Sequence, residues 1–206
     1  MPDSKVLFLG DYIDRGEYGP EVVSYLLSLK VKFPNEVFML RGNHECREMT
    51  SSYNFREQCV SMFDVEVYDA FMDLFDCLPL ACVVNGSYLC MHGGISSQMK
   101  SLESINQIDR QREPSEEGLM TDLLWADPAS TKKCSKDFKF NNDRKISVIF
   151  GKNPTNRILE SENLLSIIRA HQVQRKGYKF HKWNGPELFP PIITVFSAPN
   201  YGCRDN

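Results

Sequence analysis

The sequence lacks a long hydrophobic run and lacks a leading segment that would direct secretion. Its longest apolar runs, such as 78–84, fall far short of the roughly 20 residues that cross a bilayer. No basic segment followed by an apolar stretch opens the chain. We therefore expect neither a membrane-spanning helix nor a membrane partner, and we predict a soluble protein of the cytoplasm, with the nucleus as the other compartment that fits.

An excess of positive charge and paired C-x-x-C cysteines are also absent. Twenty-four basic against 27 acidic side chains give a formal charge of -3, so no broad cationic surface is expected to bind a nucleic-acid backbone. Seven cysteines, an odd number, favour buried thiols in a reducing compartment over a disulfide framework or a zinc finger. The absence of G-x-x-x-x-G-K-[ST] excludes a P-loop nucleotide site.

What is present is a chain of 206 residues, 42% of them hydrophobic, which is enough for one domain with a sizeable core. Apolar residues at helical spacing after Pro20, ended by Pro34, predict a helix near 19–30, and a second helical stretch is predicted at about 54–76. Short apolar runs that end in polar clusters predict five buried strands, at 6–9, 37–40, 88–91, 165–168 and 192–196. This alternation predicts an α/β fold.

The polar residues that follow these strands carry the chemistry. Loops at the carboxyl ends of strands form the ligand crevice in layered α/β proteins, so we expect the five ends to converge on one site. They supply Asp11, Asn43, His92 and His171, and three of the four histidines lie at these ends. Mixed nitrogen and oxygen donors suit manganese, iron or zinc at a catalytic site with open positions. Taken singly, His92 before two glycines also fits a turn, and His171 also fits a hydrogen-bonded structural histidine.

Five motifs stand in the order found in the metal-dependent serine/threonine phosphoprotein phosphatases, and the chain resembles that family from about residue 6 to 206. They are 10–16 (GDYIDRG), 40–45 (LRGNHE), 92–94 (HGG), 169–172 (RAHQ) and 197–201 (SAPNY). Segments 68–79, 124–128 and 163–171 resemble the calcineurin branch most, although the type-1 and type-2A branches share most of the catalytic motifs. The resemblance implies a metallophosphoesterase-like β-sandwich of mixed sheets flanked by helices.

The resemblance also implies roles for the candidate residues. Asp11 would bridge two metal ions, and Asn43, His92 and His171 would complete the ligands of the second one. His44 would be the general acid that protonates the departing serine or threonine oxygen. Asp14 would orient the His44 imidazole and favour its charged form.

Three further residues would contact the substrate under the same resemblance. Arg15 offers forked donors to phosphate oxygens, although Asp14 and Arg15 also fit a surface ion pair. Arg144 would be a second phosphate-binding arginine, but Lys145 replaces the glycine that usually follows it in the family. Tyr201 would border the substrate or simply pack. For His181, in a predicted edge strand, we expect a structural role.

One family motif is missing. Gly-Asp-x-His-Gly, whose Asp and His bind the first metal in the family, would precede the first strand, but only Met1-Pro-Asp-Ser-Lys5 stand there and no Asp-x-His occurs. The chain therefore has a full ligand set for only one of the two metals. We expect residues 1–206 to be a single, incomplete catalytic domain, truncated at both ends.

These observations predict a protein serine/threonine phosphatase that acts on phosphoprotein substrates through metal-activated water. A calcium-sensor regulatory subunit is implied if the protein is truly calcineurin-like. A catalytically impaired, phosphatase-like binding protein is the alternative, because half of the metal site is missing, and we expect little turnover from the 206 residues alone. Another metallophosphoesterase, such as a nuclease, is disfavoured by the acidic balance and by the 41–45 context.

Overall fold

A computed structural model describes residues 4–130, 137–183 and 189–203, and the chain divides into two compact units. Unit 1 comprises residues 1–79 and 109–113. Unit 2 comprises residues 80–108 and 114–206. The expectation that residues 1–206 make up one catalytic domain stays a prediction.

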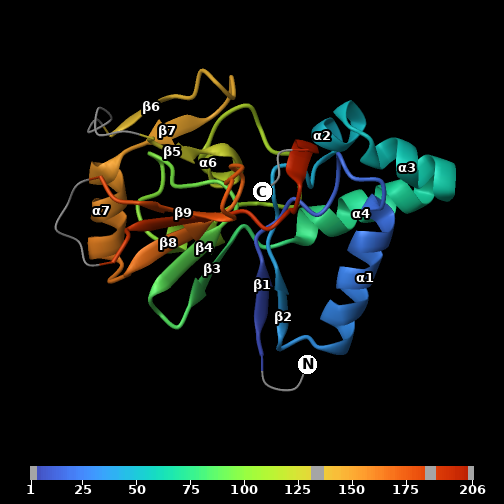
Figure 1. The fold of residues 1–206 in the computed structure, drawn as a ribbon, viewed down its shortest axis with the longest axis horizontal. Helices are drawn as coiled ribbons and strands as arrows, with labels where there is room; N and C mark the ends of the chain where they lie inside the picture. Colours follow the sequence, from blue (N-terminus) through green and yellow to red (C-terminus); the bar gives the residue numbers. More distant parts are fainter. Residues whose placement is uncertain (1–3, 131–136, 184–188, 204–206) are drawn as a thin grey trace. The chain divides into compact units, whose positions relative to one another are not determined.

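Unit 1 is a two-stranded parallel sheet with helices beside it (Figure 1). The strands are β1 (Val6–Phe8) and β2 (Val37–Met39), and the helices are α1 (Gly19–Lys32), α2 (Arg47–Ser52), α3 (Phe55–Met62) and α4 (Val65–Cys77). As predicted, α1 has proline in its first turn. Buried side chains from the helices and from β2 form one hydrophobic cluster that includes Val23, Met39, Phe55, Met72 and Phe75. Both strands run in the same direction, so the loops that follow them leave the sheet at one edge.

The helical stretch predicted at 54–76 is wrong in one respect, because it is two helices rather than one. α3 ends at Met62, and Phe63 leaves helical geometry at φ -130° and ψ -106°. Asp64 is extended, and its carboxylate accepts a hydrogen bond from the Val67 N–H at 2.9 Å. A side-chain cap of this kind starts a new helix, which explains the break.

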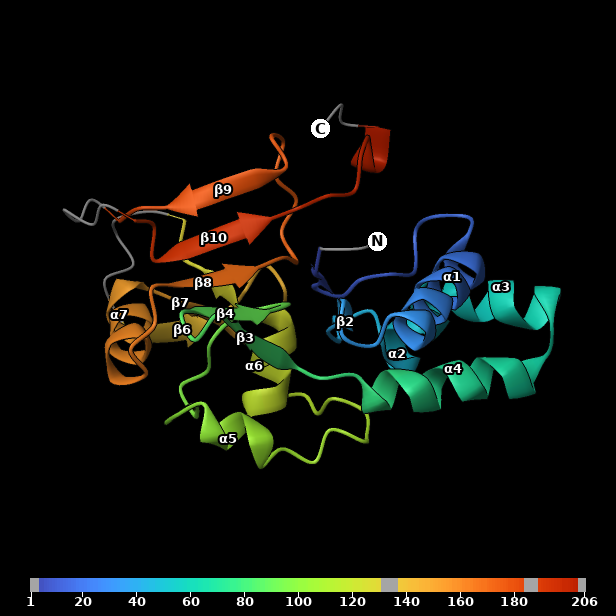
Figure 2. The same ribbon diagram turned by 90° about the horizontal axis from the view of Figure 1, so that it is seen from below.

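Unit 2 contains a five-stranded mixed sheet in the order β3-β4-β8-β10-β9, which Figure 2 shows from below. Its strands are β3 (Ala81–Val84), β4 (Tyr88–Met91), β8 (Ser166–Arg169), β9 (Tyr178–His181) and β10 (Ile192–Val195). The neighbours β4, β8 and β10 are parallel, whereas β3 and β9 pair antiparallel at the two ends of the order. The three parallel strands therefore direct their following loops to the same edge.

A second, three-stranded sheet in unit 2 has the order β5-β7-β6 and is also mixed. Its strands are β5 (Asp127–Pro128), β6 (Phe138–Phe140) and β7 (Val148–Phe150), and the remaining elements are α5 (Glu103–Asn106), α6 (Leu119–Trp125), α7 (Lys152–Ser161) and the short 3-10 helix η1 (Tyr201–Cys203). Phe150 from this sheet joins Leu89, Ile167 and Ile192 from the larger sheet in one hydrophobic cluster. Mixed sheets with helices confirm the predicted fold class.

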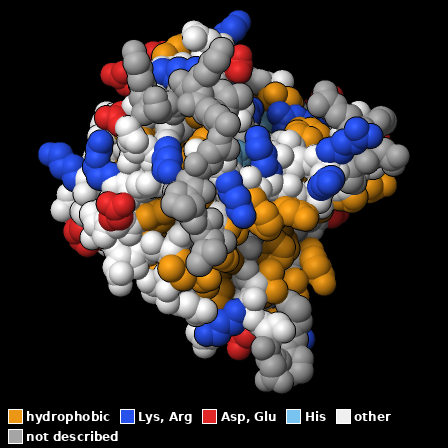
Figure 3. Space-filling model, turned by 60° about the vertical axis from the view of Figure 1, so that its left-hand side comes forward, with side chains coloured by type: hydrophobic (Ala, Val, Ile, Leu, Met, Phe, Trp, Pro, Cys, Tyr) orange, Lys and Arg blue, Asp and Glu red, His pale blue; other side chains and the backbone are white. Residues whose placement is uncertain are grey.

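All five strands predicted from apolar runs are present, with ends shifted by one residue at most. Of the seven cysteines, 46, 59, 77, 82 and 90 are free; Cys46, Cys59 and Cys90 are buried as expected, whereas Cys82 is half-buried and Cys77 is exposed. On the face drawn in Figure 3, basic side chains are interspersed with uncharged and hydrophobic ones. Among the residues that the structure describes, no helix has the length and hydropathy that a membrane-spanning segment needs.

Candidate active site

The loops after β1 and β2 touch one another in unit 1. Gly10 has a left-handed backbone at φ +95°. A Cβ atom on Gly42 would lie only 2.5 Å from Asp11 Oδ1 and 2.6 Å from Glu45 Oε2, so this close approach requires glycine. Asp11 Oδ1 accepts a hydrogen bond from the His44 N–H at 3.2 Å. The Asp11 carboxylate is thereby held against the loop that carries Asn43 and His44.

The buried Glu45 carboxylate fastens these two loops together. Oε2 accepts hydrogen bonds from the Asp11 N–H at 2.8 Å and from the Gly42 N–H at 2.7 Å, and Oε1 accepts one from the Tyr12 N–H at 2.8 Å. Burial, together with the charge of Asp11, raises the pKa of Glu45 to about 7. Burial and the Glu45 charge likewise raise the pKa of the Tyr12 hydroxyl, which donates to the Leu40 carbonyl at 2.7 Å.

His44 and Asp14 form a buried pair. Nδ1 of His44 lies 2.6 Å from Asp14 Oδ2, and the other carboxylate oxygen accepts a hydrogen bond from the Phe55 N–H at 3.1 Å. Asp14 is thus fixed by the first turn of α3, and it fixes one ring nitrogen of His44 in turn. The second nitrogen, Nε2, is the one left to hold or release a proton.

Arg15 extends toward solvent beside Tyr53. Its guanidinium carbon lies 4.8 Å from the centre of the Tyr53 ring, and NH2 donates to the Tyr53 hydroxyl at 3.2 Å. The same ring meets the His44 imidazole edge-on, with 4.9 Å between ring centres. Tyr53 therefore links the exposed arginine to the buried histidine. Asp14, for which a surface position was the alternative, is buried against His44.

In unit 2, His92 and His171 lie side by side after the parallel strands β4 and β8. Nε2 of His92 is 3.2 Å from Nδ1 of His171, and the Ala170 N–H donates to the His92 carbonyl at 3.0 Å. Two nitrogens bound at about 2.1 Å to one first-row cation lie about 3.0–3.5 Å apart. The two imidazoles therefore fit adjacent positions on one metal ion, and Trp125 packs edge-on against His171.

A second polar group in unit 2 surrounds Asp127. Its carboxylate accepts hydrogen bonds from Arg144 Nε at 3.0 Å, from Asn141 Nδ2 at 3.0 Å and from Arg169 NH2 at 3.0 Å. Arg144 NH2 also donates to the His171 carbonyl at 3.3 Å. Arg144 is thus placed beside the histidine pair. Lys145, which stands where the family usually has glycine, takes the left-handed backbone at φ +60° that glycine favours.

Tyr201, the last candidate, and His181, for which a structural role is expected, differ in their surroundings. Tyr201, in η1, packs edge-on against Phe196 with 5.1 Å between ring centres. His181 lies in the edge strand β9 and is buried, with Nε2 2.9 Å from the Thr194 hydroxyl. Burial lowers the pKa of His181 to about 3, helped by the positive charges of Lys179 and Arg169 and opposed by Asp127.

The structure therefore shows two sets of candidate residues, one in each unit. Unit 1 holds Asp11, Asn43, His44, Asp14 and Arg15 on the loops after β1 and β2, and unit 2 holds His92, His171, Arg144 and Tyr201. Close contacts join Asp11 to His44 and His44 to Asp14 in the first set, and His92 to His171 and Arg144 to His171 in the second. The convergence of both sets on one cation stays a prediction.

Three residues that support these sets through contacts had no distinct role predicted from the sequence. Glu45 and Asp127 lie inside segments that the family resemblance had marked, 40–45 and 124–128, but nothing in the spacing indicates that they hold other candidates by hydrogen bonds. Tyr53 carried no signal, because an aromatic residue between two helices is ordinary. Its contacts with Arg15 and His44 appear only in three dimensions.

Comparison with known proteins gives consistent matches. The family model described as calcineurin-like phosphoesterase matches residues 2–175. Serine/threonine-protein phosphatase 2B catalytic subunits A1 and A2 of Saccharomyces cerevisiae are 46% identical over 205 residues and 40% identical over 222, each match covering 95% of this chain. A solved serine/threonine phosphatase of S. cerevisiae, described as similar to human phosphatase PP5, superposes with a TM-score of 0.87 at 35% identity over 98% of this chain. The chain spans 37% of the length of the two subunits and 60% of the solved chain.

Proposed function

The chain belongs to the calcineurin-like phosphoesterase family, and from this premise we propose that it is a protein serine/threonine phosphatase that hydrolyses phosphoserine and phosphothreonine monoesters. The observation that carries the proposal is the buried pair of His44, next to Asn43 in the loop after β2, and Asp14 in the loop after β1, 2.6 Å apart. An ester oxygen of serine is a poor leaving group unless it receives a proton, and this pair is built to supply one.

We propose that Asp11, Asn43, His92 and His171 hold a metal ion. Their carboxylate, amide and imidazole donors suit manganese, iron or zinc, and the 3.2 Å separation of the two imidazole nitrogens fits a shared cation. In the complete family site two such ions, when bound, activate water at neutral pH and offset the charge of the phosphoryl group. The donor set named here serves one of them.

Side chains of this chain carry out the proton transfer and bind the substrate. His44, held through Nδ1 by Asp14, delivers a proton from Nε2 to the departing serine or threonine oxygen. Arg15 and Arg144 bind phosphate oxygens through forked N–H donors, steadied by Tyr53 and Asp127 respectively. Tyr201 borders the bound substrate.

The partners follow from the relatives. Two of them are named as catalytic subunits of phosphatase 2B, so we propose that this chain also works with a regulatory subunit, of the calcium-sensor type. Its substrates would be phosphoproteins of the cytoplasm or nucleus. The chain has no excess of basic residues, so a nucleic-acid substrate is not expected.

The test is phosphate release from a phosphoserine peptide by the purified full chain in the presence of Mn²⁺. We expect His44→Ala to lower kcat by about a hundredfold or more, the usual contribution of a general acid. Asp14→Asn should lower it less, because the imidazole stays in place but loses its charged partner. His92→Ala should also lower the amount of Mn²⁺ that the purified chain binds, and this can be measured without an activity assay.

Matched controls separate site effects from general damage. Arg15→Ala and Arg144→Ala should each raise KM for the peptide. Arg175 is exposed and lies outside the proposed site, so Arg175→Ala is their control and should leave KM unchanged. Mn²⁺ bound by the chain without phosphate release would favour a phosphatase-like binding protein over the enzyme. Release that survives His44→Ala undiminished would overturn the proposed role of that histidine.

A further inference from the structure

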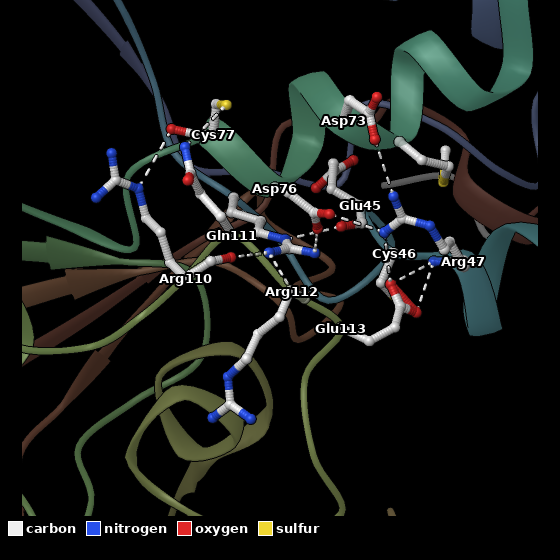
Figure 4. A network of polar contacts seen from close by, with 12 residues as sticks. Glu45, Cys46, Arg47, Asp73, Asp76, Cys77, Arg110, Gln111, Arg112 and Glu113 are labelled. Carbon is white, nitrogen blue, oxygen red and sulfur yellow. Dashed lines mark hydrogen bonds and ion pairs between the residues drawn. The ribbon is translucent and has the colours of Figure 1, made fainter.

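One polar network of unit 1 lies outside the proposed chemistry and is drawn in Figure 4. It joins the segment 109–113, which we call the strap, to the loop 41–48. The strap groups with unit 1 although the residues on either side of it, up to Ile108 and from Pro114, group with unit 2. The strap must therefore be held by its own contacts with other residues of unit 1.

Arg41 supplies the first of these contacts. Its side chain is fully buried, and NH1 donates to the strap carbonyls of Arg110 at 3.0 Å and Arg112 at 3.1 Å. Nε of the same guanidinium donates to the Glu45 carbonyl at 2.9 Å, and NH2 binds Asp76 of α4 at 2.7 Å. The buried Arg41 guanidinium thus connects the strap, the loop and α4. Each of these acceptors is needed to satisfy its N–H donors.

Glu113 supplies the second contact, at the start of α2. Its carboxylate accepts hydrogen bonds from the Arg47 N–H at 2.8 and 2.9 Å and from the Glu48 N–H at 3.2 Å. The helix has no cap of its own, because the side chain of Cys46 accepts no bond there. Glu113 therefore does from the strap what an N-cap residue normally does from the preceding position.

The Arg47 side chain completes the connection. NH1 lies 2.8 Å from Asp76 and 3.5 Å from Glu113, so α4 and the strap share a second arginine. Asp73, by contrast, reaches the same guanidinium only at 3.2 Å from an exposed position. Arg41 and Asp76 are the buried members of the network, and Arg47 and Glu113 are half-buried or more exposed.

We propose that Glu113 is a positioning residue for His44, acting through the start of α2. The loop has two short turns, from the Glu45 N–H to the Gly42 carbonyl at 3.3 Å and from the Cys46 N–H to the His44 carbonyl at 2.8 Å. Arg41 anchors it at one end and the capped helix anchors it at the other. The proposal rests on the proposed function for its catalytic meaning, but the ordering of the loop can be measured without it.

The experiment compares Glu113→Ala and Glu113→Gln with Glu116→Gln, a control at an exposed position. Hydrogen exchange in the folded full chain should speed up by about fivefold at residues 42–48 in Glu113→Ala, the factor expected for a lost helix cap. Glu113→Gln keeps one acceptor oxygen and should fall between. The Glu116 variant should match the wild type. Unchanged exchange at 42–46 in a folded Glu113→Ala chain would overturn the proposal.

A second readout depends on chemistry and would not follow from weaker folding. A phosphoserine peptide needs a proton on its leaving oxygen, whereas p-nitrophenyl phosphate releases a stabilised anion and does not. Glu113→Ala should lower kcat for the peptide by about tenfold and for p-nitrophenyl phosphate by less than about twofold. Equal losses on both substrates would show that Glu113 does not position His44. A wild-type chain of these 206 residues that releases phosphate from neither substrate would favour the phosphatase-like binding protein over the enzyme, while exchange at 42–46 would still decide the role of the strap.

Discussion

Replacing Glu45 by glutamine tests whether one buried carboxylate holds the two loops of unit 1 together. Glutamine has nearly the same shape, but it offers one acceptor oxygen where glutamate offers two. Its oxygen can take the place of Oε2 and keep the bonds from the Asp11 and Gly42 N–H groups. Its amide group then faces the Tyr12 N–H, so that two donors meet and one buried bond is lost.

The cost follows from these three bonds. A buried N–H group left without a partner costs about 1–3 kcal/mol. The two bonds that remain change from charge-assisted to neutral, which weakens each of them by about half. Taken with the easier burial of an uncharged side chain, we expect Glu45→Gln to lower the free energy of unfolding by about 2 kcal/mol.

The assay is urea unfolding at about pH 8, above the raised pKa of Glu45. Glu48→Gln is the matched control, since its exposed side chain is three positions further along the same segment, and it should cost less than about 0.5 kcal/mol. Because Glu45 holds the backbone of Asp11, Mn²⁺ affinity should also fall by about tenfold or more. Equal and small losses in the two variants would show that Glu45 does not fasten the loops.

Three further predictions concern stability. His181 is neutral in the fold and has a pKa of about 3, so protonation favours the unfolded chain. Its contribution to the free energy of unfolding should therefore fall by about 1.4 kcal/mol for each pH unit below about 6.5. In urea unfolding, the decrease in stability from pH 7 to pH 5 should be about 2 kcal/mol smaller in His181→Gln than in the wild type. Lys145→Gly should raise stability by up to about 1 kcal/mol because Lys145 has a positive φ, whereas Lys139→Gly in β6 should lower it. Asp64→Ala should cost about 1 kcal/mol by uncapping α4, while Asp69→Ala, exposed on the same helix, should cost little; a thermal shift equal in both would exclude the cap.

The strands could be predicted because burial on both faces leaves continuous apolar runs in the sequence. The runs at 88–91 and 192–196 end in polar clusters, and both lie in the parallel part of the larger sheet. The break between α3 and α4 could not be predicted in this way. The apolar spacing continues across Phe63 and Asp64, and an aspartate fits the polar face of one long helix as well as it fits the cap of a second.

The candidate site could be predicted as a set of residue types but not as a set of contacts. Asp14 and His44 are 30 positions apart, and only the parallel pairing of β1 with β2 brings their loops together. The supporting residues are harder still, because Glu45 and Glu113 act by accepting backbone N–H groups. Such bonds depend on loop geometry, and they leave no periodic pattern in the sequence.

Backbone conformation gives an indication of function that is independent of the motifs. Leaving asparagine aside, the non-glycine residues of the described ranges with left-handed φ values are Asp11, Asp14, Arg15, Lys145, Ser147 and His171. Aspartate enters this region more readily than most residues, but each of the other four costs about 1 kcal/mol relative to an ordinary conformation, so the surrounding structure must hold it in place. Four of the six are proposed site residues, and Lys145 adjoins Arg144. Strain collected at the ends of strands, and held there by Glu45 and by the Phe55 N–H, is what a site that must aim its side chains requires.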